Sequence, residues 1–211
     1  MPEDVKRPYH SARRQEQAEQ TRGRVLDAAD TVFRERGYDR ATIAAIAAAA
    51  DVADETVYAH FGNKRTLLGA LVQRAVRGDD SLPVPEQETP SALRTVTDQH
   101  EQLHLFAADI ARRLERAAPL VAVVNAAAPA EPELEELLRL LHNQRLRNLR
   151  TLVDALAANS PLRVSHAAAT ETVWALASPE LYTLLTDVRR WSRRRYAAWL
   201  AANLEVLLLA G

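Results

Sequence analysis

The side chains best suited to chemistry gather in one short stretch, DETVYAHFGNKRTLL, which spans Asp54 to Leu68. Two carboxylates, a phenol, an imidazole and an ammonium group within so few residues could form an acid–base site. The same groups would also lie on the surface of a single helix, where acidic residues favour the N-terminal turn. The sequence contains no P-loop, dinucleotide-binding glycine pattern, GxSxG or HExxH motif. We therefore expect a helix surface rather than an active site, and a protein that is not an enzyme.

The composition indicates an all-α protein. The chain has 211 residues, of which 47% are hydrophobic but only 5% aromatic, so helix formers outnumber the residues that favour strands. The absence of cysteine excludes disulfides, thiolate catalysis and cysteine metal sites. The N-terminal sequence MPEDVKRPYHSARRQEQ is charged and has no apolar segment of the length of a signal peptide or membrane span. These features predict a cytoplasmic protein.

Charge is distributed unevenly along the chain, although the formal net charge is only −1. Residues 1–78 contain 13 Lys or Arg and 11 Asp or Glu, whereas the remainder contains 14 and 17. The slight basic excess therefore lies in the N-terminal third, and it is smaller than that of a strongly basic nucleic-acid-binding protein.

Apolar periodicity predicts three helices and a fourth that follows closely. The first spans residues 18–36 and is followed by Gly37 at a C-cap position, and the second begins after Thr42, whose hydroxyl can cap it. The third spans residues 55–61, and residues 64–77 resume a helix after Gly62 and Asn63. The third helix is short, and Val57 and Phe61 share its apolar face.

A loop rich in Pro and acidic residues, at 78–90, marks the expected domain boundary. It separates an N-terminal domain of residues 18–78 from a C-terminal domain of residues 79–211. Pro or Ser stands at the start of each further apolar segment, as is typical of helix N-termini. Helices are accordingly predicted at 91–117, 119–127, 132–158, 165–177, 179–190 and 192–209.

Two short helices after a longer one form the outline of a helix-turn-helix. The sequence ATIAAIAAAADVADETVYAHFGNKRTLLGAL resembles the TetR family of transcriptional regulators. In that family a small DNA-binding domain precedes a larger helical domain, which dimerises and binds a small molecule that alters DNA affinity. The resemblance implies a three-helix helix-turn-helix domain, with the motif at about residues 41–60, followed by a helical effector-binding and dimerisation domain.

The resemblance also implies which residues contact DNA. These are Thr42, Asp54, Glu55, Thr56, Tyr58, His60 and Lys64. Four of them have a simpler alternative: Thr42 as an N-cap, Tyr58 as core, and His60 and Lys64 as solvated surface residues. Phe61 is expected in the core.

This chain departs from the family pattern in the turn. Many members have Gly and Ser where Asp51 and Ala53 stand, so Asp54 is expected to replace the missing N-cap of the third helix. Residues 42–61 contain three acids and no Lys or Arg, and acids near DNA repel phosphate. Affinity would then depend on Thr42, Lys64, Arg65 and the preceding arm with Arg13, Arg14 and Arg22, which could enter a minor groove or simply be solvated.

Polar side chains within apolar helical stripes suggest contacts in an effector pocket. His100 and His142 are predicted to point inward, and His104, Asn125 and Trp174 are weaker candidates. A hydrogen-bonded core or interface histidine is the alternative in each case. His100 and His104 lack further ligands, so no metal site and no cofactor are expected. At the C-terminus, a stripe of Tyr196, Leu200, Leu204 and Leu207 suits pairing with a second chain.

The sequence therefore predicts a dimeric repressor that a small-molecule effector releases from a palindromic DNA operator. Its expected partners are double-stranded DNA, a second copy of itself and an unidentified small molecule, with no membrane. The alternative is a helical ligand- or partner-binding protein whose degenerate helix-turn-helix binds DNA weakly.

Overall fold

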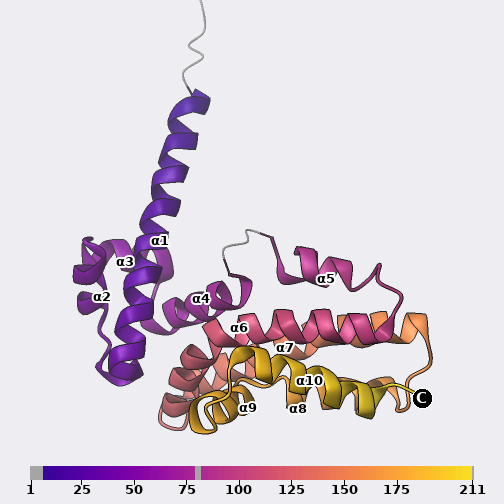
Figure 1. The fold of residues 1–211 in the computed structure, drawn as a ribbon. Coiled ribbons are helices and arrows are strands. Elements are labelled where there is room, and N and C mark those ends of the chain that lie inside the picture. The colour runs from indigo at the N-terminus through magenta and orange to yellow at the C-terminus, as the bar shows by residue number, and fades with distance from the viewer. Residues whose placement is uncertain (1–6, 79–81, 211) are drawn as a thin grey trace, which may run out of the picture. The chain divides into compact units, whose positions relative to one another are not determined.

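The N-terminal part of the chain is built from helices alone (Figure 1). In the computed structural model, which describes residues 7–78 and 82–210, they are α1 (Arg7–Arg40), α2 (Ile43–Ala50), α3 (Asp54–Phe61) and α4 (Lys64–Arg77). The chain divides into two compact units after Leu71, a position inside α4. No β-strand occurs among the described residues, so the predicted all-α fold is confirmed.

The core of the first unit consists of the apolar faces that the periodicity predicted. From α1 it buries Val32 and Phe33, and from α3 it buries Val57 and Phe61. Helix α2 contributes Ile43, Ile46, Ala47 and Ala50. Because one side of each short helix is buried in this way, the opposite sides of α2 and α3 face solvent.

Helix α1 is longer than predicted. It begins at Arg7 rather than at Ala18, so the residues expected to form an extended arm are helical. Those residues lack an apolar stripe, but most of them are Arg, Gln, Glu and Ala, which have high intrinsic helix propensity. At its other end, helical geometry stops at Gly37, with φ 70° and ψ −179°, a combination that essentially only glycine adopts.

The second unit is also a bundle of helices (Figure 1). A short 3-10 turn, η1 (Val84–Glu86), and α5 (Glu88–Ala92) precede α6 (Gln99–Ala127) and α7 (Pro132–Asn159). The chain continues through α8 (His166–Leu176), α9 (Pro179–Thr183), the π-helical turn η2 (Leu184–Val188) and α10 (Arg193–Leu208). Helix α6 packs between α7 and α10.

The C-terminal stripe predicted to pair with a second chain is mostly core. Tyr196, Leu200 and Leu204 are fully buried within this chain, whereas Leu207 is 43% exposed. The prediction was wrong for the three buried residues because α10 uses that face against α6 and α8. A stripe of apolar residues on a helix does not distinguish packing within a chain from packing between chains.

Two predicted helix boundaries in this unit are also wrong. The helix expected from Ser91 begins at Gln99, where the Asp98 carboxylate accepts a hydrogen bond from the Glu101 amide at 3.0 Å. Pro119, expected to open a new helix, lies inside α6. The neighbouring Ala117, Ala118 and Leu120 are buried, and their packing holds the helix together across the proline. The predicted starts at Pro132, Ser165, Pro179 and Ser192 agree with the structure.

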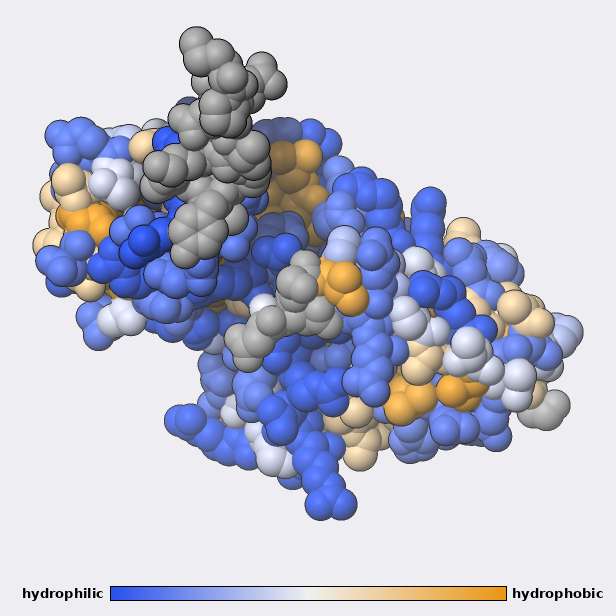
Figure 2. All heavy atoms as spheres, turned by 90° about the horizontal axis from the view of Figure 1, so that it is seen from above, coloured by the Kyte–Doolittle hydropathy of each residue, from blue (hydrophilic) through white to orange (hydrophobic). Residues whose placement is uncertain are grey.

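The surface seen in Figure 2 is largely hydrophilic, with apolar side chains in separate smaller patches. Within the described part of the chain, no helix has the length and apolarity required to cross a membrane.

Candidate functional site

Helices α2 and α3 form a helix-turn-helix with a tight connection. The Thr42 hydroxyl caps α2 by accepting a hydrogen bond from the Ala45 amide at 3.1 Å, which confirms its predicted capping role. Asp51 ends α2 in the left-handed region with φ 53°. The prediction that Asp54 caps α3 is wrong: Ala53 occupies the N-cap without a side-chain hydrogen bond, and Asp54 is the first residue of the helix. Its charge still favours that helix end.

The solvent side of α3 presents Tyr58, which is 51% exposed, together with Glu55. Tyr58 therefore lies opposite the buried Val57 and Phe61, and the alternative of a core tyrosine does not apply. Asp54, Thr56 and His60 are only half-buried, and the His60 ring lies 6.2 Å from that of Phe61.

Two cations expected near DNA have partners inside the first unit. Lys64 Nζ donates a hydrogen bond to the Tyr38 carbonyl oxygen at 2.9 Å and lies 3.9 Å from the centre of the Tyr38 ring. The Arg22 guanidinium stacks 4.5 Å from the centre of the Phe61 ring. Both residues thus join α1 to the elements that follow it, and any contact with phosphate comes in addition to this structural role.

Among the predicted effector contacts, His100 and His104 lie on the surface of the second unit. Their side chains are 66% and 65% exposed, and Glu205 Oε1 lies 3.2 Å from His100 Nδ1 and 3.3 Å from His104 Nε2. The predicted inward orientation of His100 is therefore wrong. Asn125 is also engaged elsewhere, because its Nδ2 donates to Glu180 Oε1 at 2.9 Å.

The second unit contains a cavity of about 130 Å³ between α4, η1, α6 and α7. Its walls are mainly apolar, and the apolar lining residues include Val72, Val76, Val84, Leu93, Phe106, Ile110, Leu138, Leu141, Leu149 and Leu152. His142 lines it as predicted from the α7 stripe. Trp174 is not among the residues that line the cavity, but the centre of its ring lies 5.5 Å from that of His142. An apolar cavity with few polar groups is the usual form of a small-molecule site.

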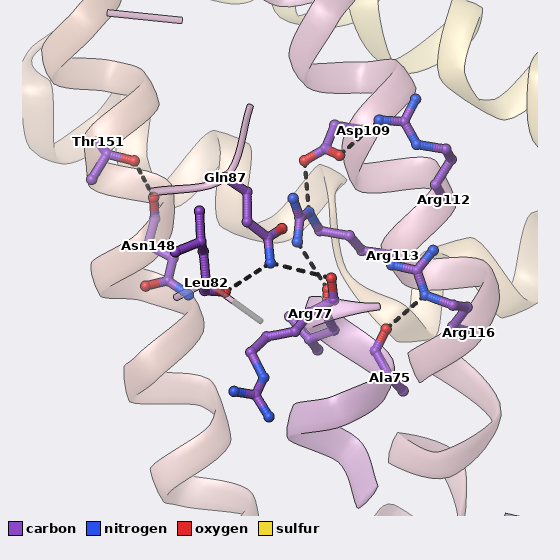
Figure 3. Close-up of polar contacts among 11 residues, drawn as sticks. Ala75, Arg77, Leu82, Gln87, Asp109, Arg112, Arg113, Arg116, Asn148 and Thr151 are labelled. Atoms are coloured by element: carbon purple, nitrogen blue, oxygen red, sulfur yellow. Dashed lines mark hydrogen bonds and ion pairs between the residues drawn. The ribbon is translucent and has the colours of Figure 1, made fainter. Parts of the chain in front are cut away.

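At one end of the cavity, an ion pair holds the C-terminal end of α4 (Figure 3). Arg113 Nε lies 2.6 Å from Asp109 Oδ2, and Arg113 Nη1 donates to the Val76 carbonyl oxygen at 2.9 Å. Arg116 Nε donates to the Ala75 carbonyl oxygen at 2.9 Å. The last carbonyl groups of a helix lack partners within the helix and carry a partial negative charge. Two cations from α6 therefore cap α4.

The segment after α4 is held by Gln87, which is 5% exposed (Figure 3). Its Nε2 donates to the carbonyl oxygens of Arg77 and Leu82, at 3.2 and 3.0 Å. The side chain thereby fixes η1, which contributes Val84 and Pro85 to the cavity wall.

A second arginine, Arg145, lines the cavity from α7. Its guanidinium lies 4.5 Å from the centre of the Trp174 ring, and its Nη1 donates to the Ala177 carbonyl oxygen at 3.0 Å. Burial lowers the pKa of Arg145 to about 10. Burial also lowers the pKa of His142, and the positive charge of Arg145 lowers it further, so both causes favour the neutral imidazole.

Sequence reasoning missed Asp109, Arg113 and Arg145. A signal existed for Arg145, because it stands between Leu141 and Leu149 in the apolar stripe of α7. A charged residue at such a position points to a buried ion pair or a ligand contact. The choice between the two depends on neighbouring helices, which the stripe does not reveal.

Comparison with known proteins places residues 25–71 in a family described as bacterial regulatory proteins, tetR family. The transcriptional regulator TtgR of Pseudomonas putida is 39% identical over 70 residues, which is 33% of each chain. The transcriptional activator FasR of Mycolicibacterium smegmatis is 39% identical over 85 residues, 40% of this chain and 36% of its own. The chain thus matches only about a third of the length of these curated relatives.

The likeness of the whole fold extends further. The crystal structure of NalD, the secondary repressor of the MexAB-OprM multidrug efflux pump in Pseudomonas aeruginosa, superposes with a TM-score of 0.69. The superposition covers 92% of this chain and 98% of NalD at 24% sequence identity. At that identity the comparison establishes the fold of the second unit and not its ligand.

Proposed function

We propose that this chain is a dimeric transcriptional repressor of the TetR type, which a small-molecule effector releases from a palindromic operator; the match of residues 25–71 to the tetR family supports the proposal. The observation that carries the proposal is the exposed Tyr58 on the second helix of a helix-turn-helix. In such motifs the second helix enters the major groove, where its exposed side chains meet bases and phosphates.

The DNA-contacting surface that we propose consists of the predicted residues. Thr42 and the free amides of α2 offer a phosphate site, and Tyr58 contacts backbone or bases. Asp54, Glu55, Thr56 and His60 lie on the same helix, and Lys64 follows it at the start of α4. The acids add specificity only where they accept a hydrogen bond from a cytosine amino group, and they weaken non-specific binding elsewhere.

A dimer is proposed because one α3 reads too few base pairs for a specific site, whereas a two-fold pair reads a palindrome. The second unit offers apolar surface for it. On α10, Val206 is 66% exposed and Leu207 is 43% exposed, and they are adjacent in sequence. We expect a second copy to cover these side chains.

Effector response is proposed to act through α4. Val72 and Val76 of this helix line the cavity, and the carbonyl of Val76 is held by Arg113, which also lines it. A ligand that favours a different arrangement of these side chains shifts the conformational equilibrium of α4. Since α4 begins at Lys64, directly after the helix-turn-helix, the shift reaches the DNA-binding domain along the chain.

The alternative function is that of a helical ligand- or partner-binding protein with a degenerate helix-turn-helix. Three acids and no Lys or Arg in residues 42–61 favour it. The internal contacts of Arg22 and Lys64 favour it as well, because they restrain the two cations that would otherwise be free to reach phosphates.

Selection of bound duplexes from a random pool at low salt tests the proposal and gives the half-site spacing. We expect an inverted repeat, and we expect Tyr58→Ala to weaken binding to it by roughly 5- to 150-fold, since a groove contact is worth about 1–3 kcal/mol. Because Tyr58 is exposed, the variant should keep its melting temperature and its dimer.

Leu140→Ala is the matched control, because Leu140 is 48% exposed but lies on α7. It should leave DNA binding unchanged. Enrichment of no duplex, together with a ligand-induced rise in melting temperature, would favour the alternative.

A further inference from the structure

Arg145 is a half-buried cation without an ion-pair partner among the described residues. Its Nη1 donates to the Ala177 carbonyl oxygen, but Nε and Nη2 are buried and have no hydrogen-bond partner in that part of the chain. Glu180 attracts the guanidinium from a longer distance, and its Oε1 accepts a hydrogen bond from Asn125. Buried charged donors are normally paired, because leaving them unpaired is costly.

Arg113 shows how the same cavity treats a buried arginine that is fully compensated. The Arg113 side chain is 7% exposed, and Asp109 lies 2.6 Å from it as a counter-ion. Its Nη1 is also satisfied, by the Val76 carbonyl oxygen. Arg145 lies in the wall of the same cavity without an equivalent of Asp109. The missing partner of Arg145 is therefore an anion, and the cavity is the space from which a ligand can supply it.

We propose that the effector is a carboxylate with an apolar body about the size of one ring, and that Arg145 binds the carboxylate through Nε and Nη2. This inference rests on the proposed effector-responsive function and names the chemical class of its ligand. Nε and Nη2 share one edge of the planar guanidinium, so their N–H bonds are parallel and match the two oxygens of a carboxylate. Both nitrogens are buried in this structure, so binding of the carboxylate requires the guanidinium to rotate toward the cavity.

The size and polarity of the cavity define the rest of the ligand. An apolar cavity of about 150 Å³ holds one benzene molecule, so about 130 Å³ accepts a body of similar size. The walls near α4 and η1, including Val76 and Val84, are apolar. A second negative charge would find no cation, because Arg113 is already neutralised by Asp109. The ligand is thus a monoanion rather than a phosphate.

The test measures binding of benzoate and phenylacetate to the full chain by calorimetry and thermal melting. Benzamide and phenylacetamide serve as neutral probes of nearly the same shape. Carboxylates should bind and raise the melting temperature, and the amides should bind at least about tenfold more weakly, since they cannot form a charge-assisted pair.

Three variants separate recognition from a structural role. Arg145→Met should weaken carboxylate binding at least about tenfold while the unliganded protein keeps or raises its melting temperature, because an apolar replacement removes an unpaired buried charge. Arg145→Lys keeps the charge but not the parallel donors, and it should bind the carboxylates with intermediate affinity. Arg139→Met is the control: Arg139 lies on the same helix, is exposed and pairs with Glu136, so binding should not change.

Equal binding of acids and amides, or no binding of either acid, would overturn the inference, as would unchanged carboxylate binding by Arg145→Met. If Arg145→Met fails to fold, Arg145→Lys decides instead: a smaller acid–amide difference supports the inference, and an unchanged difference overturns it. The proposed function fails separately. If carboxylates bind through Arg145 but do not change the affinity for a selected duplex, effector release is refuted and the ligand class stands. If only neutral compounds release the duplex, the ligand class is refuted and effector release stands.

Discussion

The buried ion pair between Asp109 and Arg113 gives a direct test of how the α4 end is held. The Asp109 side chain is 13% exposed and contacts two arginines on α6, Arg113 at 2.6 Å and Arg112 at 2.9 Å. Arg113 is 7% exposed, whereas Arg112 is 47% exposed. One carboxylate therefore has a buried partner and a solvated partner. We consider Asp109→Asn, which keeps the shape of the side chain and removes its charge.

The expected loss of stability follows from burial. Removing one member of a buried pair leaves the other charge uncompensated, which costs about 3–5 kcal/mol. Asparagine retains one acceptor oxygen, so we expect about 3 kcal/mol for Asp109→Asn. In a chain of this length each kcal/mol lowers the melting temperature by roughly 2–4 °C, which gives a decrease of about 6–12 °C. Arg112→Ala removes only the solvated partner and should cost less than about 1 kcal/mol.

The assay is denaturant and thermal unfolding of both variants beside the unchanged chain, with the far-ultraviolet circular dichroism of helices as the signal. The double variant Asp109→Asn with Arg113→Met completes the comparison. Because it removes both charges, it should be more stable than Asp109→Asn alone. Equal effects of Asp109→Asn and Arg112→Ala would refute the reasoning, and so would a double variant that is no more stable than Asp109→Asn alone.

Two further predictions concern the backbone and pH. Gly37→Ala should destabilise the protein by about 1–3 kcal/mol because of the positive φ at Gly37. Gly23→Ala should stabilise it by up to about 1 kcal/mol, because Gly23 lies in a helical stretch with open space around it. Chemical denaturation measures both free energies of unfolding, and changes of the same sign would contradict the prediction. Burial lowers the pKa of His142 below its ordinary 6.5, so the unfolded state binds more protons and stability decreases as the pH falls below about 6.5. His142→Asn should therefore show a smaller stability loss between pH 7 and 5, and an unchanged loss would exclude this cause.

The first unit could be predicted closely because its fold depends on local signals. The positions of Ile43, Ile46, Val57 and Phe61 establish which faces are buried, and Thr42 marks where α2 begins. Each of these signals acts over one helical turn. The Asp54 prediction failed within the same unit because a capping side chain was assumed where the helix begins without one.

The effector site was less predictable because its polar groups are defined by contacts between distant helices. Arg113 meets the Val76 carbonyl 37 positions away, and Arg145 meets the Ala177 carbonyl 32 positions away. No local pattern specifies such pairs. His100 shows the limit of periodicity: it was assigned to the apolar stripe of α6, but its side chain lies at the surface beside Glu205.

The two arginines also define how a bound carboxylate would be oriented. Asp109 repels a second anion from the Arg113 end of the cavity, whereas Arg145 attracts one. Val72, Val76 and Val84 line the same cavity as Arg145, so the apolar body of a ligand held at Arg145 would fill the space that these side chains enclose. Those residues belong to α4 and η1, so the apolar body rather than the carboxylate would act on α4, and ligands that share the carboxylate but differ in the body should differ in DNA release.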